Sequence, residues 1–163
     1  MTETYQSQLD SPIGTLTLVA SDDGLRKILW EDQADDADDA VLDDAHPVLA
    51  AAAAQLAEYF RGDRERFDLP LDLVGTDFQK EAWLALASVP YGETTSYAEQ
   101  AERIGRKGAF RAVGAANGKN PVPIVLPCHR IVGANGALTG FAGGLDIKQR
   151  LLALEQDQQS LDL

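Results

Sequence analysis

Hydrophobic and polar positions alternate near the start of the chain and predict two strands joined by a tight turn. Residues 11–20 alternate and are rich in β-branched side chains, which favours an extended strand. Residues 21–24, Ser-Asp-Asp-Gly, are typical of a turn because Asp-Gly accepts positive φ. Apolar positions return at residues 25–30 as a second strand. The acidic residues 31–44 have no apolar period, so they predict a loop or a weak helix.

A helical period follows from residue 47 to residue 60. Pro47 suits a first helical turn, and the alanine run has high helix propensity. The apolar side chains that can share one helical face are Val48, Leu49, Ala52, Leu56, Tyr59 and Phe60. Residues 67–71 then predict a short edge strand. Gly75 and Thr76 mark a boundary, so we expect two domains of an α+β protein, at 1–75 and 76–163.

The second half of the chain predicts mainly helices. Thr76 with Gln79 forms a capping box, and the helix it starts buries Phe78, Ala82, Leu86 and Val89. Thr95 or Ser96 caps a second helix that ends near residue 104, and a third covers about residues 108–116. Helix, glycine-containing turn and helix is the helix-turn-helix pattern, although many α-hairpins share it.

The end of the chain predicts a turn and one more helix. Residues 133–137, Gly-Ala-Asn-Gly-Ala, are typical of a hairpin turn. The last helix is expected to start at Asp146 or Ile147 and to pack through Leu151, Leu152 and Leu154. The polar tail from Asp157 is expected to fray.

Charge is distributed unevenly along the chain. The net charge is −12, and residues 1–75 alone hold 17 acids and 5 bases. Residues 103–150 hold eight bases and a single acid, Asp146. Such a basic region on an acidic chain is what a local contact with nucleic-acid phosphates requires, while the plainer interpretation is scattered solubilising charge.

Composition also limits the class of protein. No apolar run approaches the ~20 residues of a membrane span, and the N-terminus lacks a secretory signal pattern. One cysteine allows no intramolecular disulfide and favours the reducing cytoplasm. With only one cysteine and two histidines, we expect no structural metal site. We also expect no cofactor and a monomer.

The single cysteine lies in an unusual stretch, residues 121–132. Its three prolines exclude a helix there, and the apolar residues 122–126 predict a stiff, buried, extended segment that delivers Cys128. Beside His129 and Arg130, Cys128 is a candidate nucleophile, since a nearby base or positive charge makes a thiolate available. The alternative is a small core residue. Because neighbouring strand residues face opposite sides, His129 could reach Cys128 only through a turn, a kink or a bridging water.

Four segments together resemble one known family. They are Pro-Cys-His-Arg-Ile-Val at 127–132, Asn-Gly-Lys-Asn-Pro at 117–121, Pro-Tyr-Gly-Glu-Thr to Ser-Tyr at 90–97, and Gly-Gly-Leu to Leu-Leu-Ala-Leu-Glu at 143–155. In this order and spacing they resemble the O6-alkylguanine-DNA alkyltransferases, over about residues 76–156. The resemblance implies a ribonuclease H-like N-terminal domain and a winged helix-turn-helix C-terminal domain.

The resemblance also implies catalytic roles. Cys128 would accept an alkyl group, His129 would act as base through a water, and Glu155 would orient the imidazole. Tyr97 would donate a proton to the flipped base and would press against the phosphate while the base rotates out of the duplex. The plainer interpretations are a helix-end acid for Glu155 and ordinary amphipathic packing for Tyr97.

Two further sets of residues follow from the resemblance. Arg111 would enter the duplex and fill the place of the flipped base, with DNA contacts also from Ala112, Gly114, Tyr97 and Arg130. The pocket and its supports would comprise Asn120, Pro127, Ile131, Phe141, Ala142, Gly143 and Lys148. A solvated charge at Arg111 and a pre-proline turn residue at Asn120 are the plainer interpretations.

Three positions depart from the family pattern. Phe110 replaces a usually small residue of the recognition helix and could stack, wedge or pack inward. Asn117 is polar where the family is apolar or small, and Ala142 lacks the hydroxyl that some members carry.

The sequence therefore predicts a stoichiometric DNA repair protein. It would act on double-stranded DNA that carries O6-alkylguanine, and potentially O4-alkylthymine, and would be spent after one irreversible transfer to Cys128. The rival classes are a damage-binding module without transfer, a helix-turn-helix transcription regulator and a Cys-His hydrolase. The presence of Cys128 counts against the first, and Tyr97 and Arg111 have no role in the last.

Overall fold

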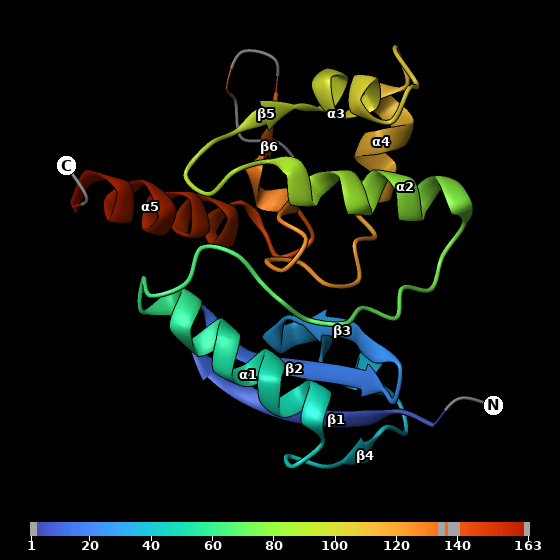
Figure 1. Ribbon diagram of the computed structural model, residues 1–163, viewed down its shortest axis with the longest axis vertical. Helices are drawn as coiled ribbons and strands as arrows, with labels where there is room; N and C mark the ends of the chain where they lie inside the picture. The colour runs from blue at the N-terminus through green and yellow to red at the C-terminus, as the bar shows by residue number, and fades with distance from the viewer. Residues whose placement is uncertain (1–2, 134–135, 137–140, 162–163) are drawn as a thin grey trace. The chain divides into compact units, whose positions relative to one another are not determined.

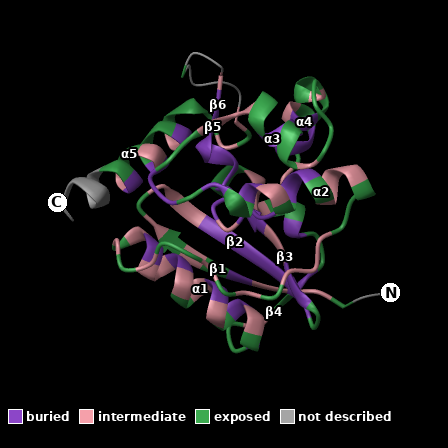
Figure 2. Cartoon of the chain, turned by 45° about the horizontal axis from the view of Figure 1, so that its top comes forward, coloured by how far each residue is buried: buried purple, intermediate pink, exposed green. Residues whose placement is uncertain are grey.

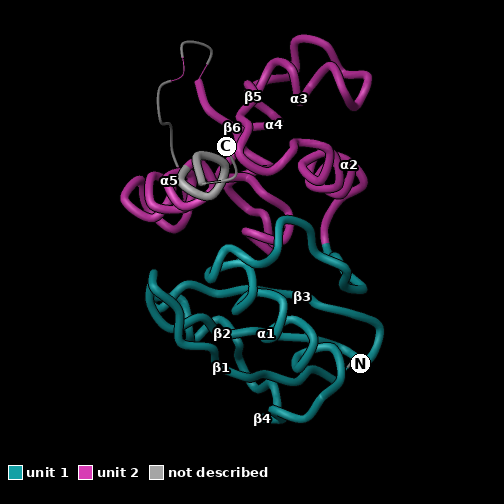
Figure 3. The backbone as a smooth tube through the Cα atoms, turned by 60° about the vertical axis from the view of Figure 1, so that its left-hand side comes forward, with its two compact units in different colours: residues 1–74 teal, residues 75–163 magenta. Residues whose placement is uncertain are grey.

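The computed structural model describes residues 3–133, 136 and 141–161, with side chains up to residue 156. The chain divides into two compact units, residues 1–74 and 75–163 (Figure 3). Each unit is described by itself. No helix in the described ranges is long and apolar enough to cross a membrane.

Unit 1 is a four-stranded sheet in the order β3-β2-β1-β4, with one helix packed on it (Figure 1). The strands are β1 (Tyr5–Ser11), β2 (Gly14–Ser21), β3 (Gly24–Leu29) and β4 (Val41–Leu42). β1, β2 and β3 are antiparallel neighbours, whereas β4 is parallel to β1. The strand predicted at 11–20 in fact begins at Gly14, because Ser11 ends β1. The sequence did not indicate β1, since most of its side chains are polar and only Ser7 is buried.

The helix of unit 1, α1 (Pro47–Phe60), confirms the prediction at both ends. Pro47 lies in the first turn, and Nδ1 of the N-cap residue His46 accepts a hydrogen bond of 3.3 Å from the Val48 amide. The buried face is narrower than predicted and consists of Leu49, Ala52, Leu56 and Tyr59 (Figure 2). Ahead of α1, the acidic stretch contains a 3-10 helix, η1 (Glu31–Ala37), and the unpredicted β4.

The edge strand predicted at residues 67–71 is wrong. Only Leu71 forms a bridge, with Leu25, and the flanking hydrogen bonds run from the Leu25 amide to Pro70 (2.8 Å) and from the Asp72 amide to Leu25 (2.9 Å). The backbone comes so close that a Cβ on Gly24 would lie 2.8 Å from Pro70. This segment therefore touches β3 at one point.

Unit 2 is mainly helical. Its elements are α2 (Asp77–Ala85), η2 (Leu86–Ser88), β5 (Thr95–Ser96), α3 (Tyr97–Arg103), α4 (Phe110–Asn117), η3 (Cys128–Arg130), β6 (Ile131–Val132) and α5 (Leu145–Leu161). The Thr76–Gln79 capping box and the Ser96 cap are confirmed. β5 and β6 form a parallel pair, with Thr95 opposite Ile131. The α5 helix starts at Leu145, one residue before the predicted start, and runs to Leu161.

The α3–turn–α4 segment has the predicted helix-turn-helix connectivity. Gly105 and Gly108 in the turn adopt φ of 74° and 87°, a region that favours glycine. Part of the predicted turn at 133–137 lies outside the described residues. Asn117, the unexpected polar residue of α4, is buried and exchanges two amide hydrogen bonds with Gln100 of α3, at 2.8 and 2.9 Å. This amide pair holds the two helices together.

Replacement of either amide by leucine should destabilise the protein, since polar atoms of the remaining amide would be buried without a partner. In Asn117→Leu, Gln100 Nε2 still donates to the Ala82 carbonyl, at 3.0 Å. We expect about 1–3 kcal/mol for Gln100→Leu or Asn117→Leu, and a double variant that costs less than the sum. Chemical denaturation of the four proteins measures the coupling. Gln149→Leu, at an exposed position, should stay within about 0.5 kcal/mol of the wild type. If the loss of stability in the double variant equals the sum of the two single losses, the two amides do not interact.

Candidate active site

A tight turn, not a strand, presents the cysteine. Cys128 is the first residue of η3, its amide donates to the Leu126 carbonyl (2.8 Å), and the Arg130 amide donates to Pro127 (3.0 Å). Cys128 is only 8% exposed, and His129 is fully buried. The turn is the kink that the sequence required if the two neighbouring residues were to serve one site.

The loop that leads to this turn differs from the extended segment that we predicted. Ile124 has a φ of 75°, which is rare for a β-branched residue, and Pro123 bridges to Leu126. The Asn120 side chain closes the loop: its Nδ2 donates to the Leu126 carbonyl (2.8 Å) and its Oδ1 accepts from the Val122 amide (3.0 Å). The prediction failed because the Asn120 side chain binds backbone groups at both ends of the loop, a contact that an apolar run does not indicate.

His129 and Glu155 form a short buried hydrogen bond. His129 Nε2 lies 2.6 Å from Glu155 Oε2, and both side chains are fully buried. An ionised carboxylate only accepts, so the proton lies on Nε2 and Nδ1 carries the lone pair. Nδ1 is buried and has no hydrogen-bond partner among the described residues. The imidazole is thus fixed in the tautomer of a base.

Arg130 is buried, and this burial argues against its predicted role as a DNA contact. Its side chain is 5% exposed, and its guanidinium binds both Glu155 oxygens, at 2.8 and 3.1 Å. A third hydrogen bond of 2.8 Å reaches the Val89 carbonyl. The resemblance implied a contact with DNA, but Arg130 is the counter-ion of the buried carboxylate.

Burial and neighbouring charges change the pKa values of Glu155, His129 and Cys128. Burial alone would raise the pKa of Glu155, but the hydrogen bonds and charges of His129 and Arg130 outweigh it and lower this pKa to about 2. Burial lowers the pKa of His129, although Glu155 opposes the change. Burial raises the pKa of the Cys128 thiol to about 11, and hydrogen bonding to Asn120 and the charge of Lys148 oppose the rise only in part. At neutral pH the site therefore holds a thiol, a neutral imidazole and a carboxylate.

Lys148 is fully buried, and its charge acts on Cys128. Its Nζ donates to the Ile131 carbonyl at 2.6 Å and lies 6.0 Å from the centre of the Phe141 ring. Burial lowers the pKa of Lys148, and its interaction with Cys128 raises it. Of the other predicted pocket residues, Pro127 and Ile131 are buried, Phe141 and Gly143 are half-buried, and Ala142 is exposed.

The buried carboxylate should make the fold sensitive to acid. Because the folded-state pKa of Glu155 lies near 2 and its ordinary value is 4.5, its contribution is complete above pH 4.5. This contribution, about 3 kcal/mol, is lost as pH falls from 4.5 to 2. Urea denaturation across this range should show a shallower acid loss in Glu155→Gln than in the wild type. Glu102→Gln, which changes an exposed acid of α3, should lose stability with falling pH as steeply as the wild type. If the wild type and both variants lose stability equally, Glu155 does not cause the acid sensitivity.

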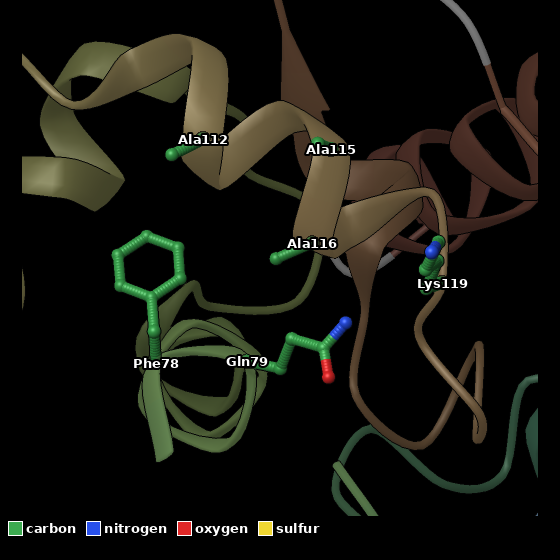
Figure 4. Close-up of a pocket in the computed structure, with 6 residues that line it drawn as sticks. All are labelled: Phe78, Gln79, Ala112, Ala115, Ala116 and Lys119. Carbon is green, nitrogen blue, oxygen red and sulfur yellow. The ribbon is translucent and has the colours of Figure 1, made fainter. Parts of the chain in front are cut away.

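The remaining predicted residues lie on α3 and α4. A Cβ on Gly114 would lie 3.7 Å from the Tyr97 ring, so these two residues are neighbours. Arg111 and Ala112 are exposed on α4. Between α4 and α2 lies a hollow of about 240 Å³, lined by Phe78, Gln79, Ala112, Ala115, Ala116 and Lys119 (Figure 4). The side of the hollow that α4 forms consists of alanine side chains.

The structure joins Cys128, His129 and Glu155 through elements far apart in sequence, while Tyr97 and Arg111 belong to the helix-turn-helix. The sequence missed the Gly92 amide, which donates to Glu155 at 3.3 Å, and the Val89 carbonyl that accepts from Arg130. Backbone groups leave no signal in side-chain patterns. No cluster of three or more His, Cys, Asp or Glu side chains that could hold a metal occurs in the described ranges.

Comparisons with known proteins agree across both units. Residues 77–157 match the family model "6-O-methylguanine DNA methyltransferase, DNA binding domain", and residues 4–73 match its ribonuclease-like domain. A methylated-DNA–protein-cysteine methyltransferase of Mycolicibacterium paratuberculosis is 51% identical over 91% of this chain and 90% of its own length. One of Methanosarcina barkeri is 44% identical over 94% and 98%.

A solved structure has the same fold over nearly the whole chain. The crystal structure of Mycobacterium tuberculosis OGT in complex with DNA superposes with a TM-score of 0.87, at 45% identity over 94% of each chain. The predicted fold class, a ribonuclease-like domain followed by a DNA-binding domain, is thereby confirmed. The chain belongs to the 6-O-methylguanine DNA methyltransferase family.

Proposed function

We propose that this protein repairs DNA by transferring the alkyl group of O6-alkylguanine to Cys128. The observation that carries the proposal is the buried histidine next to the thiol, held by Glu155 with its Nδ1 lone pair uncommitted among the described residues. A thiol with a pKa of about 11 needs such a base. Nucleophile, base and orienting carboxylate have the order that nucleophilic catalysis requires.

The transfer is a displacement at the alkyl carbon. His129 Nδ1 takes the thiol proton through one water molecule, the S–C bond forms, and the bond from carbon to O6 breaks with its electron pair leaving on guanine. The Tyr97 hydroxyl donates a proton to the guanine. Tyr97 then regains a proton, through solvent, from the protonated His129. The Glu155 carboxylate stabilises the imidazolium meanwhile. The products are guanine in DNA and S-alkylcysteine.

The reaction consumes the protein. Release of the alkyl group would need a second nucleophile, and the chain has no other thiol. We therefore infer a single, irreversible turnover without a cofactor. O4-alkylthymine presents the same oxygen-bound alkyl carbon and is a candidate second substrate.

We propose that α4 is the element that contacts the duplex. Arg111 would fill the place of the flipped base, and Ala112 and Gly114 would admit the backbone. The hollow beside Ala112 suits an approaching strand, and Lys119 at its rim suits a phosphate (Figure 4). With Arg130 and Lys148 buried, the remaining basic side chains of the 103–150 region are exposed: Arg103, Arg106, Lys107, Arg111, Lys119 and Arg150.

The other predicted residues would shape the base pocket. Asn120 and Pro127 fix the turn that carries the thiol, and Lys148 anchors Ile131 next to it. Phe141, Ala142 and Gly143 would form its cover, with backbone groups that recognise the guanine edge. Residues 1–75 would support the catalytic unit, residues 76–163, and we propose that the protein acts as a monomer in the cytoplasm.

Intact mass spectrometry tests the proposal. After incubation with a duplex that contains one O6-methylguanine, the wild type should gain one methyl group, mapped to Cys128, and the restored guanine should appear in the DNA. Cys128→Ala should show no gain.

Other outcomes point to other functions. No gain with tight binding of the lesion duplex would favour a damage-sensing module. Neither transfer nor binding would overturn the proposal.

A further inference from the structure

Phe110 is an exposed aromatic side chain on the helix that would meet DNA. It is the first residue of α4 and is 47% exposed. Phe110 lies on the same side of α4 as the buried Val113 and Asn117, but in the first turn, where its side chain stays about half exposed. Among the described residues, the other exposed large hydrophobic side chains are all aliphatic. Packing inside the unit therefore leaves about half of this side chain open to a partner.

The surroundings of Phe110 fit an anionic partner. Arg106 and Lys107 in the preceding turn and Arg111 in α4 are exposed bases, and of these Arg106 pairs with Glu81 at 3.4 Å. The Arg111 guanidinium lies 5.9 Å from the centre of the Phe110 ring. One end of α4 thus presents two flat groups side by side, one cationic and one apolar. Nucleic acid offers both counterparts, phosphates for the charge and base faces for the ring.

We propose that Phe110 is a second wedge, which stacks on a base next to the position that Arg111 fills. This inference rests on the proposed function and deepens it by naming a further DNA-binding residue. Apolar side chains that enter between base steps unstack them and promote distortion of the duplex. The ring would lower the cost of extruding the target nucleotide by replacing part of the lost stacking.

A stacking contact also suits an acidic protein. Phosphate contacts release counterions and weaken as salt rises, whereas a ring on a base releases none. With a net charge of −12, the chain gains affinity through Phe110 without dependence on salt.

The test compares Phe110→Ala, Phe110→Tyr and the wild type with two substrates. With an O6-methylguanine duplex, Phe110→Ala should lose about 5- to 150-fold in affinity or single-turnover rate. Phe110→Tyr, which keeps a ring, should stay within about threefold. With free O6-benzylguanine, which needs no base extrusion, all three should react at the same rate. Leu84→Ala, an exposed apolar residue of α2, is the matched control and should behave as the wild type.

Salt dependence and base extrusion give independent readouts. The slope of log affinity against log salt should be unchanged in Phe110→Ala and shallower in Arg111→Ala. Fluorescence of 2-aminopurine placed beside the lesion should rise less with Phe110→Ala than with the wild type.

Two results would overturn the wedge. One is an unchanged duplex affinity and rate in Phe110→Ala, and the other is an equal loss with the free base, which would mean a structural role. If the wild type transfers no alkyl group to Cys128, the proposed function has failed. Affinities for undamaged duplex then still decide whether Phe110 contacts DNA.

Discussion

Replacement of Arg130 by methionine should lower the free energy of unfolding by about 3–5 kcal/mol, because it leaves the Glu155 carboxylate buried without its counter-ion. The guanidinium makes two of the hydrogen bonds to that carboxylate and one to the Val89 carbonyl. Methionine fills a similar volume, so the loss reports charge and hydrogen bonding more than packing. For a domain of ordinary stability this is a large fraction of the total.

Urea denaturation at pH 7 measures the effect. Lys107→Met removes an exposed charge of the same unit and should change stability by less than about 0.5 kcal/mol. The double variant Arg130→Met, Glu155→Leu should recover part of the loss, because no unpaired charge remains. If the single variant is as stable as the Lys107 control, the ion pair does not stabilise the fold.

Replacement of His129 by glutamine should slow alkyl transfer by about 10²- to 10⁴-fold, the usual contribution of a general base. A glutamine amide nitrogen can take the place of Nε2 and keep a donor toward Glu155, but nothing replaces Nδ1. The thiol, with a pKa of about 11, then keeps its proton at neutral pH. Because burial lowers the pKa of His129 from 6.5, the wild type should keep its rate as pH falls through 6.5.

Rapid-quench kinetics with protein in excess over O6-methylguanine duplex measure the single turnover from pH 5.5 to 9. His46→Gln changes the other histidine of the chain, which belongs to unit 1, and should transfer at the wild-type rate. A His129→Gln rate within threefold of the wild type at neutral pH would exclude a role as base.

The elements that the sequence predicted correctly depend on residues a few positions apart. Thr76 and Gln79 satisfy each other's backbone groups, Ser96 caps α3, and Pro47 starts α1. Each device acts within one helical turn, so its pattern is visible in a single chain. The N-terminal caps at Thr76 and Ser96 therefore indicate where the first two helices of unit 2 begin.

The features that failed depend on contacts far apart in the chain. β1 is polar, and its strand conformation comes from pairing with β2. The loop at 122–126 is bent by the Asn120 amide, and Arg130 is drawn inward by Glu155, 25 residues away. The Gln100–Asn117 pair joins two polar residues that looked unrelated. Cys128, His129 and Glu155 could be named from the family resemblance, but the Nε2–H tautomer required the geometry.

Because the chain has a single cysteine, the state of its thiol tells whether a molecule has already reacted. Under the proposed reaction, an unused chain holds one thiol and a spent chain holds none. Unfolding in denaturant exposes Cys128 to a thiol reagent, so the thiol count per chain equals the unspent fraction. The number of chains without a thiol equals the number of lesions removed, and this count needs no labelled DNA. A cell's pool of this protein is thus a dosimeter of alkylation that chemical titration can read.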